Sequence, residues 1–234
     1  MTLPIVLISG QLLTRDFWAP LEARLAERTI VYADNQRDDT IAGMATRLLD
    51  AAPPRFHLVT HAMGGFVAFE IMRRAPERVA SLTLLATLAT ADGPAQLARR
   101  QGYVDLVENG AFDQVVEERL PMLMAADRRE GEVADIARRM AADTGAEAFL
   151  RQQRAIIARI DSRPGLAAIA VPTLLLRGDQ DGIVGAEQIE MIAAGVPHAT
   201  AMTLAGAGHL LMLEEPVTVG RLIEDHVAAA DSAE

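Results

Sequence analysis

Short apolar runs alternate with segments of helical periodicity along most of this 234-residue chain. The apolar runs lie at residues 3–8, 29–33, 56–60, 79–86, 171–177 and 199–204. Near-continuous apolarity over such short lengths is typical of parallel strands that are buried on both faces. The alternation therefore predicts an α/β fold, with a mostly parallel six-stranded sheet, flanking helices and right-handed crossovers.

One long stretch interrupts this rhythm, because residues 88–163 contain helical patterns and no convincing strand. Val133, Ile136 and Met140 fall on one helical face, and residues 144–147 have the spacing of a capping box. We predict three segments: residues 1–87 and 165–234 form the core, and residues 88–164 form a helical lid between strands four and five. Residues 228–234 are expected to fray.

Composition excludes several classes of protein. The chain has no cysteine, which rules out disulfides, thiolate metal sites and a cysteine nucleophile. All 22 basic residues are arginine, and the net charge of −10 argues against binding to nucleic acid or an anionic membrane. No segment approaches the ~18 apolar residues of a membrane helix, and the start lacks a basic leader. We expect a soluble cytoplasmic protein.

The residues that follow the third apolar run have the pattern of a strand, a tight turn and a helix. They read Thr60-His61-Ala62-Met63-Gly64-Gly65. This pattern indicates a nucleophile elbow, G-x-S-x-G, in which the central residue lies at the top edge of the sheet. Two positions depart from it: Thr60 replaces the first glycine, and Ala62 replaces the serine. The turn is therefore expected without its nucleophile.

An acid and a histidine follow the fifth and sixth runs. The fifth run leads into Gly178 to Asp181, and the sixth leads into Gly208-His209. Carboxyl ends of parallel strands share one edge of a sheet, so these side chains should meet the elbow there. Asp179 is a second carboxylate in the same turn, but the spacing from Gly178 favours Asp181. His209 alone would fit a core histidine equally well.

Together these landmarks, with Pro76-Glu77-Arg78-Val79, resemble the α/β-hydrolase family in its compact form. The resemblance covers essentially the whole chain and is weakest in residues 88–163. It implies that Asp181 is the triad acid, His209 the base and Ala62 the nucleophile position. The implied reaction is hydrolysis of a small carboxylic ester or lactone through an acyl-enzyme; amide or C–C bond hydrolysis is the alternative. No metal or organic cofactor is implied, since a triad supplies both nucleophile and base.

The family builds its oxyanion hole from two backbone N–H groups. The resemblance assigns them to Met63 and, where the family has H-G-x, to Gln11 in Ser9-Gly10-Gln11; Leu12 remains an alternative for the second donor. Each candidate for substrate binding also has a structural interpretation as core, support or solvated face. These candidates are Leu12, Trp18, His61, Met122 and Gln152. His57, His198 and His226 are interpreted as surface or structural residues.

Three hypotheses account for Ala62. The first, which we favour because Asp181, His209 and the glycines remain, is a serine hydrolase whose nucleophile was replaced by alanine on purpose. The second is a natural pseudoenzyme that binds a small ligand in the hydrolase pocket. The third is an enzyme that needs no serine and uses His209 as a general base for a lyase reaction or a cofactor-free oxygenation. The expected partner is a small-molecule ester or lactone, and the composition fits a monomer or a homodimer.

Overall fold

The computed structural model describes residues 2–233 and contains a six-stranded sheet in the order β2-β1-β3-β4-β5-β6. The strands are β1 (Ile5–Ile8), β2 (Ile30–Tyr32), β3 (Phe56–His61), β4 (Val79–Leu85), β5 (Thr173–Gly178) and β6 (Ala199–Leu204). All five strand pairings are parallel. The predicted fold class is confirmed, with a sheet that is wholly rather than mostly parallel.

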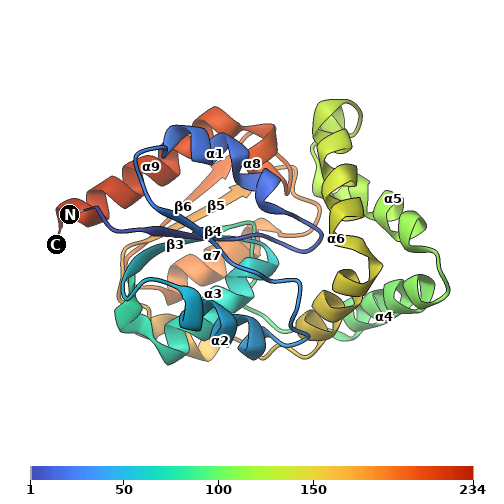
Figure 1. Ribbon diagram of the computed structural model, residues 1–234, viewed down its shortest axis with the longest axis horizontal. Coiled ribbons are helices and arrows are strands. Elements are labelled where there is room, and N and C mark those ends of the chain that lie inside the picture. Colours follow the sequence, from blue (N-terminus) through green and yellow to red (C-terminus); the bar gives the residue numbers. More distant parts are fainter. Residues whose placement is uncertain (1, 234) are drawn as a thin grey trace.

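Helices cover both faces of the sheet (Figure 1). One face carries α1 (Ala19–Arg24) and α9 (Pro216–Ser232), and the other carries α2 (Ile41–Ala51), α3 (Met63–Arg74) and α7 (Ala186–Gly195). Along β1, Val6 and Ile8 pack with the α2, α3 and α7 side, whereas Ile5 and Leu7 pack with the α1 and α9 side. Successive strand residues point to opposite faces, so a strand covered on both sides must be apolar throughout. Short helices η1 (Arg15–Trp18), η2 (Pro76–Arg78) and α8 (Leu211–Glu214) complete the core.

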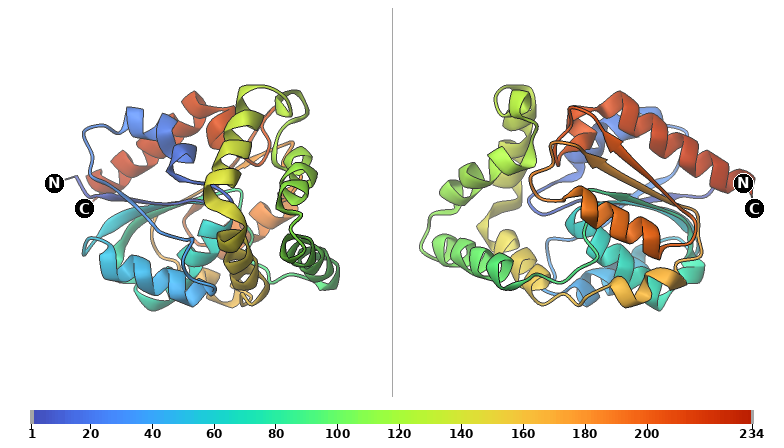
Figure 2. Two further views of the ribbon diagram at one scale, coloured as in Figure 1. Left: turned by 45° about the vertical axis from the view of Figure 1, so that its right-hand side comes forward. Right: turned by 180° about the vertical axis from the view of Figure 1, so that it is seen from behind.

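A helical insertion lies between β4 and β5, beyond the carboxyl ends of the strands. It contains α4 (Pro94–Glu108), α5 (Phe112–Leu123), η3 (Ala126–Arg128) and α6 (Glu132–Ile157), and η4 (Arg163–Ala168) leads back to the sheet. α6 lies nearer the sheet, and α4 and α5 pack on its outer side (Figure 2). The division of the chain into a core and a separate lid remains a prediction.

The predicted capping box coincides with a kink inside α6. Gly145 has φ 77° and ψ 168°, so the helix is interrupted there and restarts. The hydroxyl of Thr144 donates to the carbonyl of Met140 at 2.8 Å, so it closes the preceding turn. The sequence signal thus marks a real break, although the structure counts one helix across it.

The end of α9 is fixed to the sheet. Asp231 Oδ1 accepts a hydrogen bond from the amide of Leu3 at 3.3 Å, and Oδ2 pairs with Arg28 at 2.7 Å. Nε2 of His57 lies 3.0 Å from Oδ1 of Asp231, and its Nδ1 lies 2.9 Å from the hydroxyl of Ser81. The expectation that residues 228–234 fray is therefore wrong up to Ser232, while Glu234 lies outside the described residues. His57 is structural and fully buried, which excludes the surface interpretation.

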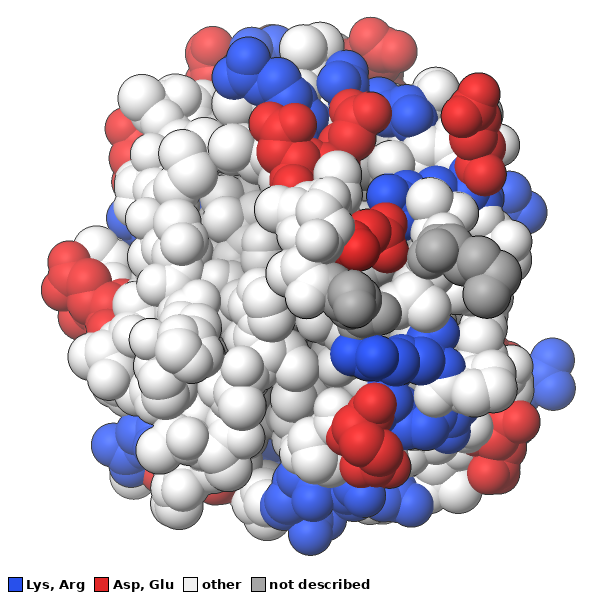
Figure 3. All heavy atoms as spheres, turned by 90° about the vertical axis from the view of Figure 1, so that its left-hand side faces the viewer, with Lys and Arg blue, Asp and Glu red and all other residues white. Residues whose placement is uncertain are grey.

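Figure 3 shows the end of the molecule opposite the insertion. On this face the acidic and arginine side chains of the described residues are interspersed, and one half of the face is largely uncharged. None of the helices within residues 2–233 is long and apolar enough to cross a membrane.

Candidate active site

The elbow between β3 and α3 is present with alanine at its centre. Ala62 has φ 47° and ψ −109°, a backbone conformation that is costly for a residue with a side chain. Three hydrogen bonds hold it: its N–H donates to Leu85 at 2.9 Å, and its carbonyl accepts from the Thr87 hydroxyl at 2.7 Å and the Gly65 amide at 2.9 Å. The strained geometry therefore forms without a serine.

Close approaches of neighbouring backbone and side-chain atoms explain the glycines around the elbow. A Cβ atom on Gly64 would lie 2.5 Å from the carbonyl oxygen of Ile8, and one on Gly65 would lie 2.2 Å from the Thr87 hydroxyl. A Cβ atom on Gly10 would lie 2.6 Å from Nδ1 of His61. Only glycine fits at these three positions, which bring β1, β3 and α3 together at the carboxyl edge of the sheet.

Asp181 and His209 form a buried pair. His209 Nδ1 lies 2.9 Å from Asp181 Oδ2, and because a carboxylate only accepts, Nδ1 donates this hydrogen bond, which leaves Nε2 as the atom that can act on a substrate. Asp181 Oδ1 accepts from the amides of Ile183 at 2.8 Å and Val184 at 3.0 Å. Burial acts to raise the pKa of Asp181, but His209 and these amides outweigh it and hold the pKa below its ordinary value. Asp179 is exposed and instead accepts from Gly206 at 2.8 Å.

The loop after β1 carries the two candidate amides for the second oxyanion donor, those of Gln11 and Leu12, and the Leu12 amide already has a hydrogen-bond partner. Leu12 has φ 61°, and its N–H donates to Oε1 of Gln152 at 3.2 Å. Gln152 is fully buried and also donates to the carbonyl of Asn35 at 3.3 Å. Gln152 therefore supports the loop from behind. On the other side of the elbow, Met63 is the first residue of α3, where an amide has no acceptor within the helix.

A cavity of about 90 Å³ lies over the elbow, between the sheet edge and the insertion. Its lining includes most of the residues that the sequence singled out: Gln11, Leu12, His61, Ala62, Met63, Met122 and His209. Three others lie outside the lining. Asp181 lies behind His209, Gln152 lies behind Leu12, and Trp18 is fully buried with its indole N–H donating to the Ser9 hydroxyl at 3.0 Å.

His61 connects the elbow to the histidine loop. Its Nε2 donates to the carbonyl of His209 at 2.9 Å, so its Nδ1 is unprotonated; that atom is buried and has no hydrogen-bond partner. The two imidazole rings lie 4.8 Å apart between centroids. Burial, followed by the neighbouring His209, lowers the pKa of His61 to about 3, so this ring stays neutral at working pH.

Sequence reasoning missed two groups that the structure places at the site. Arg99, Arg100 and Arg119 of the insertion line the cavity, and no motif or spacing identifies them. Glu214 is buried, and its Oε2 accepts from the amides of Gly208 and Ala125, each at 2.9 Å. Its position five residues after His209 was the only available signal. Residues 2–233 contain no cluster of three or more His, Asp or Glu side chains placed to hold a metal ion.

Comparison with known proteins places this geometry in a family. The model of the alpha/beta hydrolase fold family matches residues 19–216, and the chain therefore belongs to the α/β-hydrolase family.

Its similarity to individual members is moderate. The chain is 30% identical over 230 residues to "Putative carbamate hydrolase RutD" of Azorhizobium caulinodans, covering 91% of this chain and 86% of that protein. It is 26% identical to a pimeloyl-[acyl-carrier protein] methyl ester esterase of Xanthomonas campestris, covering 96% and 95%. A thermophilic esterase from Thermogutta terrifontis, solved with malate bound, superposes with a TM-score of 0.88 at 26% identity, covering 97% and 90%.

Proposed function

We propose that the cavity over Ala62 is the active site of a hydrolase for a small ester-type substrate, a carboxylic ester or a lactone. The observation that carries this proposal is the His209–Asp181 pair, whose base lines the same cavity as the elbow and the Met63 residue. The esterase relatives support this substrate class.

The arrangement fits acyl transfer with a serine at position 62. The serine oxygen would attack the substrate carbonyl carbon while His209 Nε2 takes its proton, and the departing alcohol would receive that proton. Water would then attack the acyl-enzyme by the same route, which restores the serine and releases the acid. The amides of Met63 and Gln11 would hold the negative oxygen, since the Leu12 amide already donates to Gln152.

Alanine at position 62 supplies no hydroxyl, so the chain as it stands forms no acyl-enzyme there. An alanine in place of serine retains the elbow and removes one oxygen atom. We infer that position 62 is built for a serine, because the strained φ of 47°, the acid and the base all remain.

A second candidate is direct attack by water. His209 Nε2 would take a proton from a water molecule in the cavity, and the resulting hydroxide would attack the carbonyl carbon of a carbamate or ester. The bond to the alcohol or amine would then break, and the leaving group would take that proton from His209. The specific observation in its favour is that the Asp181–His209 pair is intact next to an alanine, together with the relatives described as carbamate hydrolases. This route needs no group at position 62.

Turnover is measured for four proteins to separate these routes. They are the parent chain, its Ala62→Ser variant, and each of these two with His209→Gln added. Short-chain aryl esters, small lactones and phenyl carbamate serve as substrates. The serine route predicts an inert parent and an Ala62→Ser variant that is faster by on the order of 10⁴–10⁶ in kcat, with a burst of alcohol release. The water route predicts parent turnover that His209→Gln abolishes. If all four proteins stay inert, the hydrolase proposal fails and ligand binding without cleavage remains.

A further inference from the structure

Three arginines face the cavity in a protein whose net charge is −10. Arg99 and Arg100 come from α4, and Arg119 comes from α5. The same cavity reaches Ala62 and His209 through a mostly apolar lining. Positive charge is thus concentrated at the insertion side of the cavity, opposite the elbow.

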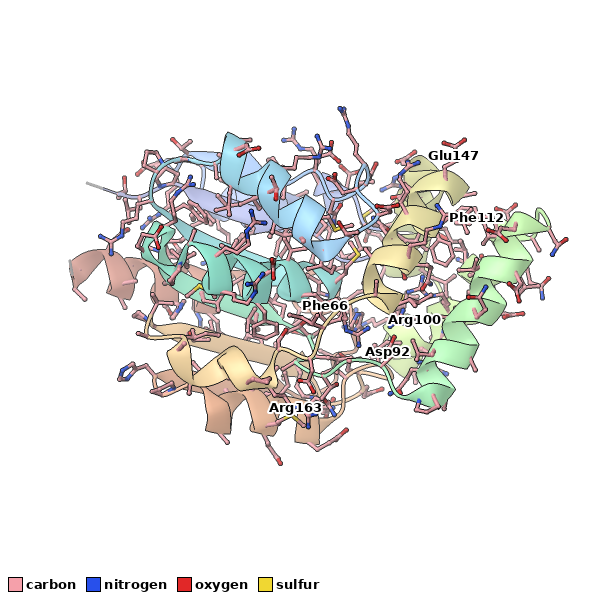
Figure 4. The ribbon with its side chains drawn as sticks, turned by 90° about the horizontal axis from the view of Figure 1, so that it is seen from below. Phe66, Asp92, Arg100, Phe112, Glu147 and Arg163 are labelled. Carbon is pink, nitrogen blue, oxygen red and sulfur yellow. The ribbon has the colours of Figure 1, made fainter. Side chains whose placement is uncertain are left out.

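One carboxylate near this group is shared by two guanidinium groups. Asp92 pairs with Arg100 through Oδ2 and with Arg159 through Oδ1, the latter at 2.7 Å. Figure 4 shows Asp92 and Arg100 next to each other in the space between α4 and Phe66 of α3. Because Asp92 carries one negative charge, it neutralises only one of the two arginines.

Arg119 has no such partner. It forms no ion pair within residues 2–233, and its Nη1 is buried without any hydrogen-bond partner. Its guanidinium lies over the ring of Phe149 at 5.6 Å and that of Tyr103 at 6.0 Å, which fixes its orientation. Burial, with Arg100 next in effect, lowers the pKa of Arg119 to about 10, so it still carries its charge at neutral pH.

The Arg119 side chain is partly exposed, but its Nη1 is buried without a partner, so part of its charge is removed from water at a cost in free energy. An anion that enters the cavity would compensate that cost. A guanidinium binds a carboxylate through two parallel hydrogen bonds, which gives both strength and orientation. The rings of Phe149 and Tyr103 restrict this group before any ligand binds, so less ordering is needed on binding.

We propose that Arg119, assisted by Arg99 and Arg100, binds a carboxylate group of the substrate. The substrate is then an ester or lactone that carries a free carboxylate away from the bond to be broken. This inference rests on the proposed function and extends it: the elbow holds the reacting carbonyl, and α4 and α5 hold the charged end.

Binding to the parent chain tests the carboxylate site without any turnover. Monomethyl succinate, monomethyl glutarate and monomethyl adipate are titrated by calorimetry beside the corresponding dimethyl esters, which have the same acyl chains and no charge. We expect at least one monomethyl ester to bind tenfold or more tightly than its dimethyl partner. Arg119→Met removes the charge and should abolish that preference, and Arg119→Lys should retain part of it.

Arg138→Met is the matched control, because Arg138 on α6 forms an exposed ion pair with Glu117 at 2.8 Å and does not line the cavity. It should leave the preference unchanged. The melting temperature of each variant verifies folding, and if Arg119→Met is unstable, Arg119→Gln replaces it as the uncharged variant. Equal binding of charged and neutral esters in the parent, or an unchanged preference without the Arg119 charge, overturns the inference.

The two proposals fail separately. Arg119-dependent binding of a monomethyl ester, together with an inert Ala62→Ser variant, would retain the carboxylate site and reject the hydrolase. Turnover by Ala62→Ser without any preference for charged esters would retain the hydrolase and reject the carboxylate site.

Discussion

The amide nitrogen of Gly208 lies 2.9 Å from Oε2 of Glu214, so a buried carboxylate holds the backbone immediately before His209. The same oxygen accepts from the amide of Ala125, which follows α5 in the insertion. One side chain therefore couples the position of the proposed base to the position of the insertion.

Substitutions of Glu214 should separate hydrogen bonding from charge. Glu214→Gln retains an oxygen for both amides and should fold. Glu214→Ala leaves two buried N–H groups without partners and should lose about 2–3 kcal/mol of unfolding free energy. In an active Ala62→Ser background, Glu214→Ala should lower kcat more than it changes KM, since it displaces His209. Urea unfolding and steady-state kinetics measure both effects; an alanine variant with parent stability would contradict this role.

The pH dependence of Glu214 has a defined sign. Burial outweighs its hydrogen bonds and raises the pKa of this carboxyl above its ordinary value near 4.5. Its contribution to stability is therefore most favourable at low pH and declines as pH rises from about 4.5 through the raised folded pKa. The stability of Glu214→Gln relative to the parent should increase over that window.

Asp181→Asn should reverse the tautomer of His209. The oxygen that faces Ile183 and Val184 must remain an acceptor for two amides, so the new NH₂ group faces Nδ1 of His209. Nδ1 must then accept, the proton moves to Nε2, and the ring can no longer take a proton from the nucleophile. We expect kcat of the Ala62→Ser protein to fall by about 10³–10⁴ with little change in melting temperature. An activity loss below tenfold would remove Asp181 from its proposed role.

His61 should make the protein sensitive to acid. Its folded pKa of about 3 lies below its ordinary value of 6.5, so its contribution is complete above pH 6.5 and is lost as pH falls toward 3. Between pH 7.5 and 4.5 this one group should account for about 2–3 kcal/mol of lost stability. His61→Gln can still donate to the His209 carbonyl and should lose correspondingly less over that range. Denaturant unfolding at both pH values measures the difference, with exposed His198→Gln as a control that should follow the parent.

Gly178→Ala should be strongly destabilising. A Cβ atom there would lie 2.0 Å from the carbonyl oxygen of Ala207, and main chain cannot move aside as a flexible side chain can. The strand that leads to Asp181 and the loop that carries His209 would separate, at a cost of about 2–4 kcal/mol. Gly102→Ala is the matched control: it lies within α4, where the new Cβ would have no atom within 4 Å other than those of its chain neighbours and its own helix backbone, and it should gain about 0.5–1 kcal/mol. Similar effects at the two positions would contradict the close approach.

Periodicity and turn chemistry predicted the fold because both are local. The run at residues 199–204 matches β6 residue for residue, and β4 differs from its predicted range by one residue. The elbow was predictable because only Gly64 and Gly65 permit its close approaches, whatever residue occupies position 62. The meeting of the elbow, Asp181 and His209 was then predictable, because parallel strands end at one edge of the sheet.

Contacts between segments that are distant in the sequence were not predictable in the same way. Arg119 looks like any exposed helical arginine in the sequence, and its isolation depends on how α5 packs against α4 and α6. Trp18 was a substrate-binding candidate only because of its position in the sequence, but its indole N–H donates a hydrogen bond to the Ser9 hydroxyl within the core. The tail containing Asp231 looked frayed because its polar residues gave no sign of Arg28 and Leu3, which are more than two hundred positions away in the chain.

The hydrogen bond between the Leu3 amide and the Asp231 carboxylate has a practical consequence for circular permutation of the chain. It places the two ends of the described chain side by side, at the end of the sheet away from the cavity (Figure 1). A short linker could therefore join them into a continuous polypeptide, and new ends could be opened at exposed Gly110, between α4 and α5. Such a circular permutant would divide the arginine-bearing helices between its two termini while leaving the elbow, Asp181 and His209 within one uninterrupted sheet.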